Sequence, residues 1–177
     1  ASFPDYLDSL EGNEYDVDVA TQVPHAALRV FVMGERGANR EEATAEDRSA
    51  MAQLAADGMR AGAFGFSTSR LLQHRTAEGE PIPSYGAAQE ELLEIADALA
   101  YVGRGWIQTV GDFEDAIDAE FELRREMAAR SGLPLTMTLL QKEARPEEWR
   151  DLLGRIEEAN AEGLRITAQI RGRPTSV

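Results

Sequence analysis

TAEDRSAMAQLAADGMRAGAFGFS, residues 44–67, contains one complete unit of a helix followed by a strand. Thr44, with Asp47 three residues later, has the form of a helix N-cap. The apolar residues that follow recur at helical spacing, at Met51, Leu54, Ala55 and Met59. Gly62 ends the predicted helix, and the short apolar run 63–67 predicts a strand.

The same order of helix and strand recurs three more times toward the C-terminus. The predicted helices contain residues 92–99, span 112–130 and begin at Pro146, and the strands that follow them are 106–110, 133–140 and 164–170. Upstream, a short helix is predicted from Ser2 to Gly12, and residues 15–23 alternate as a strand that Pro24 ends. Residues 26–33 fit either a short helix or a second strand, and residues 34–39 are predicted to be a loop.

Five strands separated by four helices predict a parallel sheet with right-handed crossovers. This order fits either an open doubly wound sheet or part of a closed barrel. A complete eight-stranded barrel takes ~250 residues, whereas this chain has 177 and stops soon after its last strand. The predicted fold class is therefore α/β, with parallel β/α units forming about five strands of a TIM-type (β/α)8 barrel. Residues 1–177 are expected to be one central segment of that larger barrel.

The composition restricts the possible partners and chemistry. Acidic residues number 32 against 18 basic ones, and a net charge of −14 argues against binding to nucleic acid. No apolar run approaches the ~18 residues of a membrane span. Cysteine is absent, which excludes disulfides, thiolate ligands and a thiol nucleophile, and fits a cytoplasmic location.

Ligand sites in parallel β/α folds lie at the carboxyl ends of the strands. The polar residues that follow the predicted strands are His25 and Arg29, then Ser67, Thr68, Ser69, Arg70 and His74, then Asp112, then Gln141 and Lys142, and last Arg171 and Arg173. His25 is a candidate general base or substrate ligand, although a histidine there can also satisfy local backbone groups. For His74, which lies within a polar loop, a solvated surface histidine is the favoured interpretation.

Several better-known motifs are missing. The sequence around Ser67 lacks the second glycine of a nucleophile elbow, and Gly103-Arg-Gly105 precedes a strand instead of joining a strand to a helix. No His-x-His, cysteine pair or His-Glu-x-x-His occurs, so no metal ligands are predicted. The acidic pairs Glu90-Glu91 and Glu147-Glu148 fall at helix starts and are interpreted as solvated capping residues.

Three sequence blocks together resemble a known family: Val23-Pro-His-Ala-Ala-Leu-Arg29, Val32-Met-Gly34 and Ala61-Gly-Ala-Phe-Gly-Phe-Ser-Thr68. They resemble the D-aminoacylase (N-acyl-D-amino-acid deacylase) branch of the amidohydrolase superfamily, and the likeness covers nearly the whole chain. The resemblance implies a (β/α)8 barrel with zinc at its mouth, where metal-activated water hydrolyses a C–N amide bond. The family's His-x-His pair and its aspartate would fall outside this chain.

The chain also departs from that family. Where the family commonly has histidines at the ends of its fifth and sixth strands, this sequence has Gln108-Thr-Val110 and Thr138-Leu-Leu140. Valine and leucine cannot ligate zinc. The residues predicted to bind substrate are His25, Arg29, Ser67, Thr68 and Arg70, and no catalytic residue is assigned.

The leading hypothesis is a parent enzyme that uses zinc to hydrolyse N-acyl-D-amino acids, while the 177-residue chain itself neither binds zinc tightly nor turns over substrate. The alternative is a non-catalytic α/β module that binds a small polar ligand or a partner at its strand ends. A nucleotide-binding doubly wound domain is disfavoured, because no loop that would cradle phosphate is present. If the segment stands alone, its unpaired edge strands predict self-association.

Overall fold

A computed structural model describes residues 2–111, 117–170 and 172. Its single sheet has the strand order β1-β2-β3-β4-β5, and every neighbouring pair is parallel. The strands are β1 (Gln22–Pro24), β2 (Gly65–Ser69), β3 (Trp106–Val110), β4 (Leu135–Thr138) and β5 (Ile166–Gln169). The helices are α1 (Phe3–Glu11), α2 (His25–Met33), α3 (Glu35–Ala38), α4 (Ala45–Ala61), α5 (Gln89–Ala100), α6 (Ile117–Ser131) and α7 (Glu148–Ala161).

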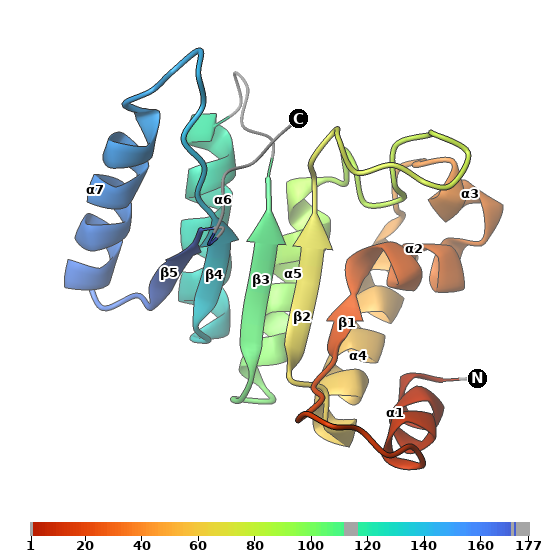
Figure 1. The fold of residues 1–177 in the computed structure, drawn as a ribbon. Helices are drawn as coiled ribbons and strands as arrows, with labels where there is room; N and C mark the ends of the chain where they lie inside the picture. The colour runs from red at the N-terminus through yellow and green to blue at the C-terminus, as the bar shows by residue number, and fades with distance from the viewer. Residues whose placement is uncertain (1, 112–116, 171, 173–177) are drawn as a thin grey trace.

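The order of the strands resolves the choice between the two folds that the sequence left open. A doubly wound sheet reverses its strand order and carries helices on both faces, whereas strands in a barrel follow one another in chain order. Here the strand order is the chain order, and α4, α5 and α6 all lie behind the sheet (Figure 1). The predicted α/β class with parallel β/α units is confirmed, and the sheet has the form of a barrel arc.

Alternation along the strands gives the sheet two different faces. Phe66, Ile107, Leu135 and Ile166 are each at most 1% exposed and pack toward the helices. The alternate residues of each strand point to the other face, which we call the open face: Gln22, Pro24, Gly65, Ser67, Ser69, Trp106, Gln108, Val110, Thr136, Thr138, Thr167 and Gln169. This face, which would line the interior of a closed barrel, is predominantly polar.

Side-chain amides cross the open face. Gln22 Nε2 donates to Gln108 Oε1 at 2.9 Å, and Gln108 Nε2 donates to Gln169 Oε1 at 3.4 Å. The three side chains come from β1, β3 and β5, so the amide row connects the two edges of the arc. Among the described residues, no helix is both long and apolar enough to cross a membrane.

Helix α4 begins with the N-cap that the sequence predicts. Asp47 N donates to Thr44 Oγ1 at 3.2 Å, and Thr44 N donates to Asp47 Oδ2 at 3.0 Å, so the capping box is complete. Gly62 follows the helix with φ 128°, a backbone conformation that favours glycine.

Replacing Thr44 with alanine is expected to lower the free energy of unfolding by about 1 kcal/mol, because one backbone N–H at the start of α4 loses its acceptor. Urea denaturation measures this loss. Thr44→Ser keeps the accepting oxygen and should stay close to wild type, and an equally large loss for serine would contradict the capping explanation.

The segment upstream of β2 differs from its prediction. Only Gln22–Pro24 pairs as a strand, although residues 15–23 alternate in sequence, and Tyr15, Val17 and Val19 are between 47% and 72% exposed. Alternation produces a strand only where a neighbour supplies hydrogen bonds, and β2 pairs only with Gln22, Val23 and Pro24. Residues 26–33 are helical, and α3 occupies part of the predicted loop 34–39. The predicted start of a helix at Asp112 lies outside the described residues.

Candidate functional site

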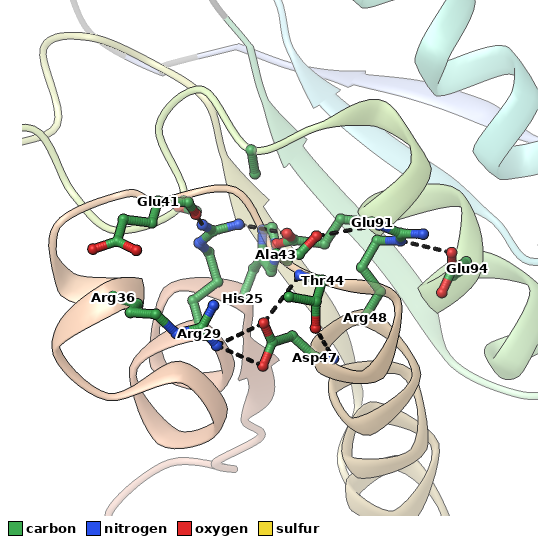
Figure 2. A network of polar contacts seen from close by, with 12 residues as sticks. His25, Arg29, Arg36, Glu41, Ala43, Thr44, Asp47, Arg48, Glu91 and Glu94 are labelled. Carbon is green, nitrogen blue, oxygen red and sulfur yellow. Dashed lines mark hydrogen bonds and ion pairs between the residues drawn. The ribbon is translucent and has the colours of Figure 1, made fainter.

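Four polar side chains meet beneath the carboxyl ends of β1 and β2. His25 is the first residue of α2 directly after β1, and Arg29 lies one turn further along that helix. Thr68 points from β2 toward the helices. Glu91 enters from the first turn of α5 (Figure 2). We call His25, Arg29, Thr68 and Glu91 the Glu91 cluster.

The Glu91 carboxylate holds the Glu91 cluster together. His25 Nε2 lies 2.5 Å from Glu91 Oε1, and Arg29 Nη1 donates to Glu91 Oε2 at 2.5 Å. Arg29 Nη2 donates to the Glu41 carbonyl at 2.5 Å, and Thr68 Oγ1 lies 2.8 Å from His25 Nδ1. Because an ionised carboxylate only accepts, Nε2 of His25 donates to Glu91, and Nδ1 accepts from the hydroxyl of Thr68.

The cluster is closed to solvent: the side chains of His25 and Glu91 are 0% exposed and that of Arg29 is 2% exposed. Burial lowers the pKa of His25, against the opposing effect of the Glu91 hydrogen bond. Burial alone would raise the pKa of Glu91, but the hydrogen bonds from His25 and Arg29 and the charge of Arg29 outweigh it and hold that pKa below its ordinary value. At neutral pH the cluster is therefore a neutral imidazole beside a carboxylate–guanidinium ion pair.

The lowered pKa of His25 predicts a loss of stability in mild acid. Below its ordinary pKa of 6.5 the unfolded chain protonates this histidine while the folded protein does not, so the unfolded state binds more protons. The free energy of unfolding should fall between pH 6.5 and pH 5.5, with a limiting slope of about 1.4 kcal/mol per pH unit. Denaturant unfolding at several pH values measures the slope.

Two variants isolate His25 in this pH series. His25→Gln should flatten the slope between pH 7.5 and 5.5, and His74→Gln, which leaves the buried His25 in place, should keep it. The lowered pKa of Glu91 acts below its ordinary value of 4.5, outside this window. An unchanged slope in His25→Gln would refute the assignment.

A second buried ion cluster lies beneath the ends of β2 and β3. Arg70 Nε donates to Glu120 Oε1 at 2.8 Å, and Arg124 Nη2 lies 3.7 Å from Glu120 Oε2. Arg124 Nε also donates to Thr109 Oγ1 at 3.2 Å, and burial lowers the pKa of Arg124 to about 10. Arg70 donates in addition to the carbonyl of Ala87, which connects the two ends of the loop after β2.

The five residues predicted to bind substrate are thus separated into three environments. His25, Arg29 and Thr68 contact one another or Glu91, and Arg70 belongs to the second cluster. Only Ser67 lies on the open face, partly exposed. Direct substrate contact by the other four would require their present hydrogen bonds to open, and substrate binding by all five stays a prediction. Of the other candidates, Asp112, Arg171 and Arg173 lie outside the described residues.

The interpretation of Glu91 as a solvated capping residue is wrong. It is 0% exposed, because it lies one turn before Ile95 on the face of α5 that packs against the sheet. That helical spacing was the signal that could have identified it. Arg124 carries a similar signal, since it lies three residues after Phe121 and three before Met127, both buried.

The described side chains do not fit a zinc site. Among them, no group of three histidine, cysteine, aspartate or glutamate residues is close enough to hold a metal ion. Val110, the last residue of β3, points to the open face, and Leu139 directly after β4 is 7% exposed. Both lie in the segments where the family resemblance implied histidines, and neither side chain can ligate zinc.

The one-sided arc of parallel strands, with polar groups at the strand ends, defines a segment of the β/α-barrel class. A model of an amidohydrolase family matches residues 1–175, and the chain belongs to that family. An N-acyl-D-glutamate deacylase of Alcaligenes xylosoxydans xylosoxydans is 29% identical over 174 residues, which cover 97% of this chain and 33% of that protein. A D-aminoacylase of the same organism is 30% identical over 129 residues, 71% of this chain and 24% of that protein.

Solved structures support the same assignment. A D-aminoacylase structure, described by the role of its binuclear metal center, superimposes with a TM-score of 0.78 at 28% identity. It covers 96% of this chain, which in turn covers 33% of it. An N-acyl-D-glutamate deacylase from Bordetella bronchiseptica, complexed with zinc and a phosphonate inhibitor, has a TM-score of 0.76 at 23% identity and supports the fold alone. The chain thus spans between about a quarter and a third of the length of these relatives.

Proposed function

We propose that residues 1–177 are the central segment of a longer amidohydrolase that cleaves the amide bond of N-acyl-D-amino acids. The observation that carries this proposal is the family match over residues 1–175, together with relatives that deacylate N-acyl-D-amino acids. The sequential strand order supports it as well, because it leaves room for further strands at both edges of the arc.

In this proposal the segment supplies part of the wall of the substrate site. The Glu91 cluster fixes the end of β1 against β2 and α5, and the second cluster fixes the ends of β2 and β3. Ser67 and the other side chains of the open face then meet the substrate from a rigid frame. Rigid placement of such groups reduces the entropy that binding costs.

The proposed enzyme depends on a metal, with zinc as the expected ion. A bound metal ion lowers the pKa of water and polarises a carbonyl oxygen. Since the described residues do not fit a metal site, its ligands would come from outside them, and no step of the chemistry is assigned to this chain through the metal.

The proposed partner is a small amide, with neither nucleic acid nor a membrane as a further partner. The net charge of −14 supports the exclusion of nucleic acid, and the absence of cysteine fits the proposed cytoplasmic location. The 177-residue chain by itself is proposed to self-associate, because β1 and β5 each have one edge that no described strand pairs with. Gel filtration at two concentrations tests this, and a strictly monomeric chain would refute it.

The decisive experiment compares enantiomers. The experiment uses the full-length natural protein that contains this sequence, loaded with zinc. It should release acetate from N-acetyl-D-glutamate or N-acetyl-D-leucine and not from the L forms. A chelator should abolish turnover, and added zinc should restore it. If the zinc-loaded protein cleaves none of the D substrates, the proposal is wrong.

The lack of a group of metal ligands among the described residues favours a second candidate, a non-catalytic module that binds a small polar ligand. Binding of N-acetyl-D-glutamate without release of acetate, measured by calorimetry on the same preparation, would support that alternative instead.

A further inference from the structure

A serine–histidine pair lies at the mouth of the arc, outside both buried clusters. Ser69 is the last residue of β2 and points to the open face, where it lies in register with Val110 of β3. Its Oγ is 2.7 Å from Nδ1 of His74, whose side chain is exposed. The pair therefore sits where ligands bind in parallel β/α folds.

The hydrogen bonds of Ser69 favour one tautomer of His74. Leu71 N donates to Ser69 Oγ at 3.4 Å, so Oγ accepts there and its own hydrogen is available to His74 Nδ1. When Ser69 donates to Nδ1, the proton of the neutral ring is on Nε2. Within the described part of the chain, Nε2 has no hydrogen-bond partner, so a donor remains available at the mouth.

The loop that carries His74 is held in place by several contacts. The backbone of His74 donates to Leu71 O at 3.1 Å and accepts from Ile82 N at 3.3 Å. Ser84 Oγ donates to Ser69 O at 2.8 Å, and Arg40 donates to Pro81 O at 2.8 Å. Such a loop presents the imidazole in one place before a ligand arrives, which reduces the entropic cost of binding.

One cationic side chain adjoins the pair. Arg75 follows His74 directly and is exposed, whereas Arg70 is paired with Glu120 and Glu80 of the same loop lies 3.7 Å from Arg40. An anion that reaches Nε2 of His74 therefore meets the cation of the adjacent residue. A carboxylate accepts from an N–H donor more strongly than a neutral group does.

We propose that His74 is a substrate-binding residue that donates from Nε2 to the carboxylate of the N-acyl amino acid, and that Ser69 positions it by fixing its tautomer. This inference rests on the proposed function for the identity of the substrate. It adds to the proposed substrate site a hydrogen-bond donor, His74, that comes from the loop after β2 and not from a strand.

Steady-state kinetics of the full-length natural protein test the contact between His74 and the substrate carboxylate. His74→Ala should raise KM for N-acetyl-D-glutamate about tenfold with little change in kcat, because a hydrogen bond to a charged group is lost. His74→Gln keeps an N–H near the position of Nε2 and should recover most of the loss. Gln73→Ala, an exposed neighbour in the same loop, is the matched control and should leave KM unchanged. Unchanged KM in His74→Ala would overturn the proposal.

A readout independent of turnover keeps the two proposals distinguishable. The ¹⁵N shifts of the imidazole should report the Nε2–H tautomer for neutral His74 and a tautomer mixture in Ser69→Ala. Titration with N-acetyl-D-glutamate should shift the His74 signals while the buried His25 stays fixed. A protein that binds this way without turnover would refute the proposed function alone, whereas a dominant Nδ1–H tautomer or unmoved His74 signals would refute the role of His74.

Discussion

Replacing Glu91 with glutamine is expected to lower the free energy of unfolding by about 3–5 kcal/mol, the usual cost of removing one partner of a buried ion pair. The substitution keeps the size of the side chain and removes its charge, so the guanidinium of Arg29 stays buried without a counter-ion. In the wild type, His25 and Arg29 each donate to a separate oxygen of the Glu91 carboxylate. The glutamine amide has only one accepting oxygen for these two donors. Urea denaturation at fixed protein concentration measures the effect.

The matched control for this variant lies on the same helix. Glu94 is one turn further along α5, 38% exposed, and pairs with Arg48 at 2.7 Å. Glu94→Gln should cost less than about 1 kcal/mol, because water reaches this partly exposed pair and screens its charges. If Glu91→Gln and Glu94→Gln lowered the free energy of unfolding equally, burial would not explain the contribution of the Glu91 carboxylate to stability.

Replacing Gly65 with alanine is expected to lower the free energy of unfolding by about 2–3 kcal/mol, as overpacking in a core does. An added Cβ would lie 2.4 Å from the carbonyl oxygen of Trp106 and 3.1 Å from its carbonyl carbon. Both atoms belong to the backbone of β3, which cannot move aside without disturbing the β2–β3 ladder. The same denaturation experiment measures the loss.

A glycine in open space provides a control of opposite sign. At Gly154 in α7 an added Cβ would meet nothing within 4 Å. Gly154→Ala should therefore stabilise the protein by up to about 1 kcal/mol through its higher helix propensity. If Gly65→Ala were as stable as wild type, the close approach of β3 would not limit the side chain at this position.

Much of the fold was predictable because its signals are local. The strand 106–110 was predicted with the bounds that β3 has, and the cap at Thr44 and the stop at Gly62 are present as predicted. The N-cap depends on contacts between residues three apart, and apolar spacing shows which face of a helix is buried. The prediction of residues 15–23 failed because a strand also needs a partner, and alternation says nothing of where that partner ends.

The candidate site was predictable only in its location. The sequence placed His25, Thr68 and Arg70 at strand ends, which is where the structure has them, but it gave no information on what they contact. Glu91 is 66 residues from His25 and 62 from Arg29, and Glu120 is 50 residues from Arg70. No local pattern encodes pairs that far apart.

By itself the sequence determined the alternation of helices and strands, the parallel α/β class and the family resemblance, because turns, caps and apolar periods depend on near neighbours. Only the tertiary structure decided that the strands follow chain order with helices on one side, and that Glu91 is the buried centre of a cluster and not a surface cap. It also decided which of the polar strand-end residues face the open side, as Ser67 and Ser69 do. The physical reason is that burial and ion pairing depend on segments brought together by the chain crossovers, and sequence distance does not measure that proximity.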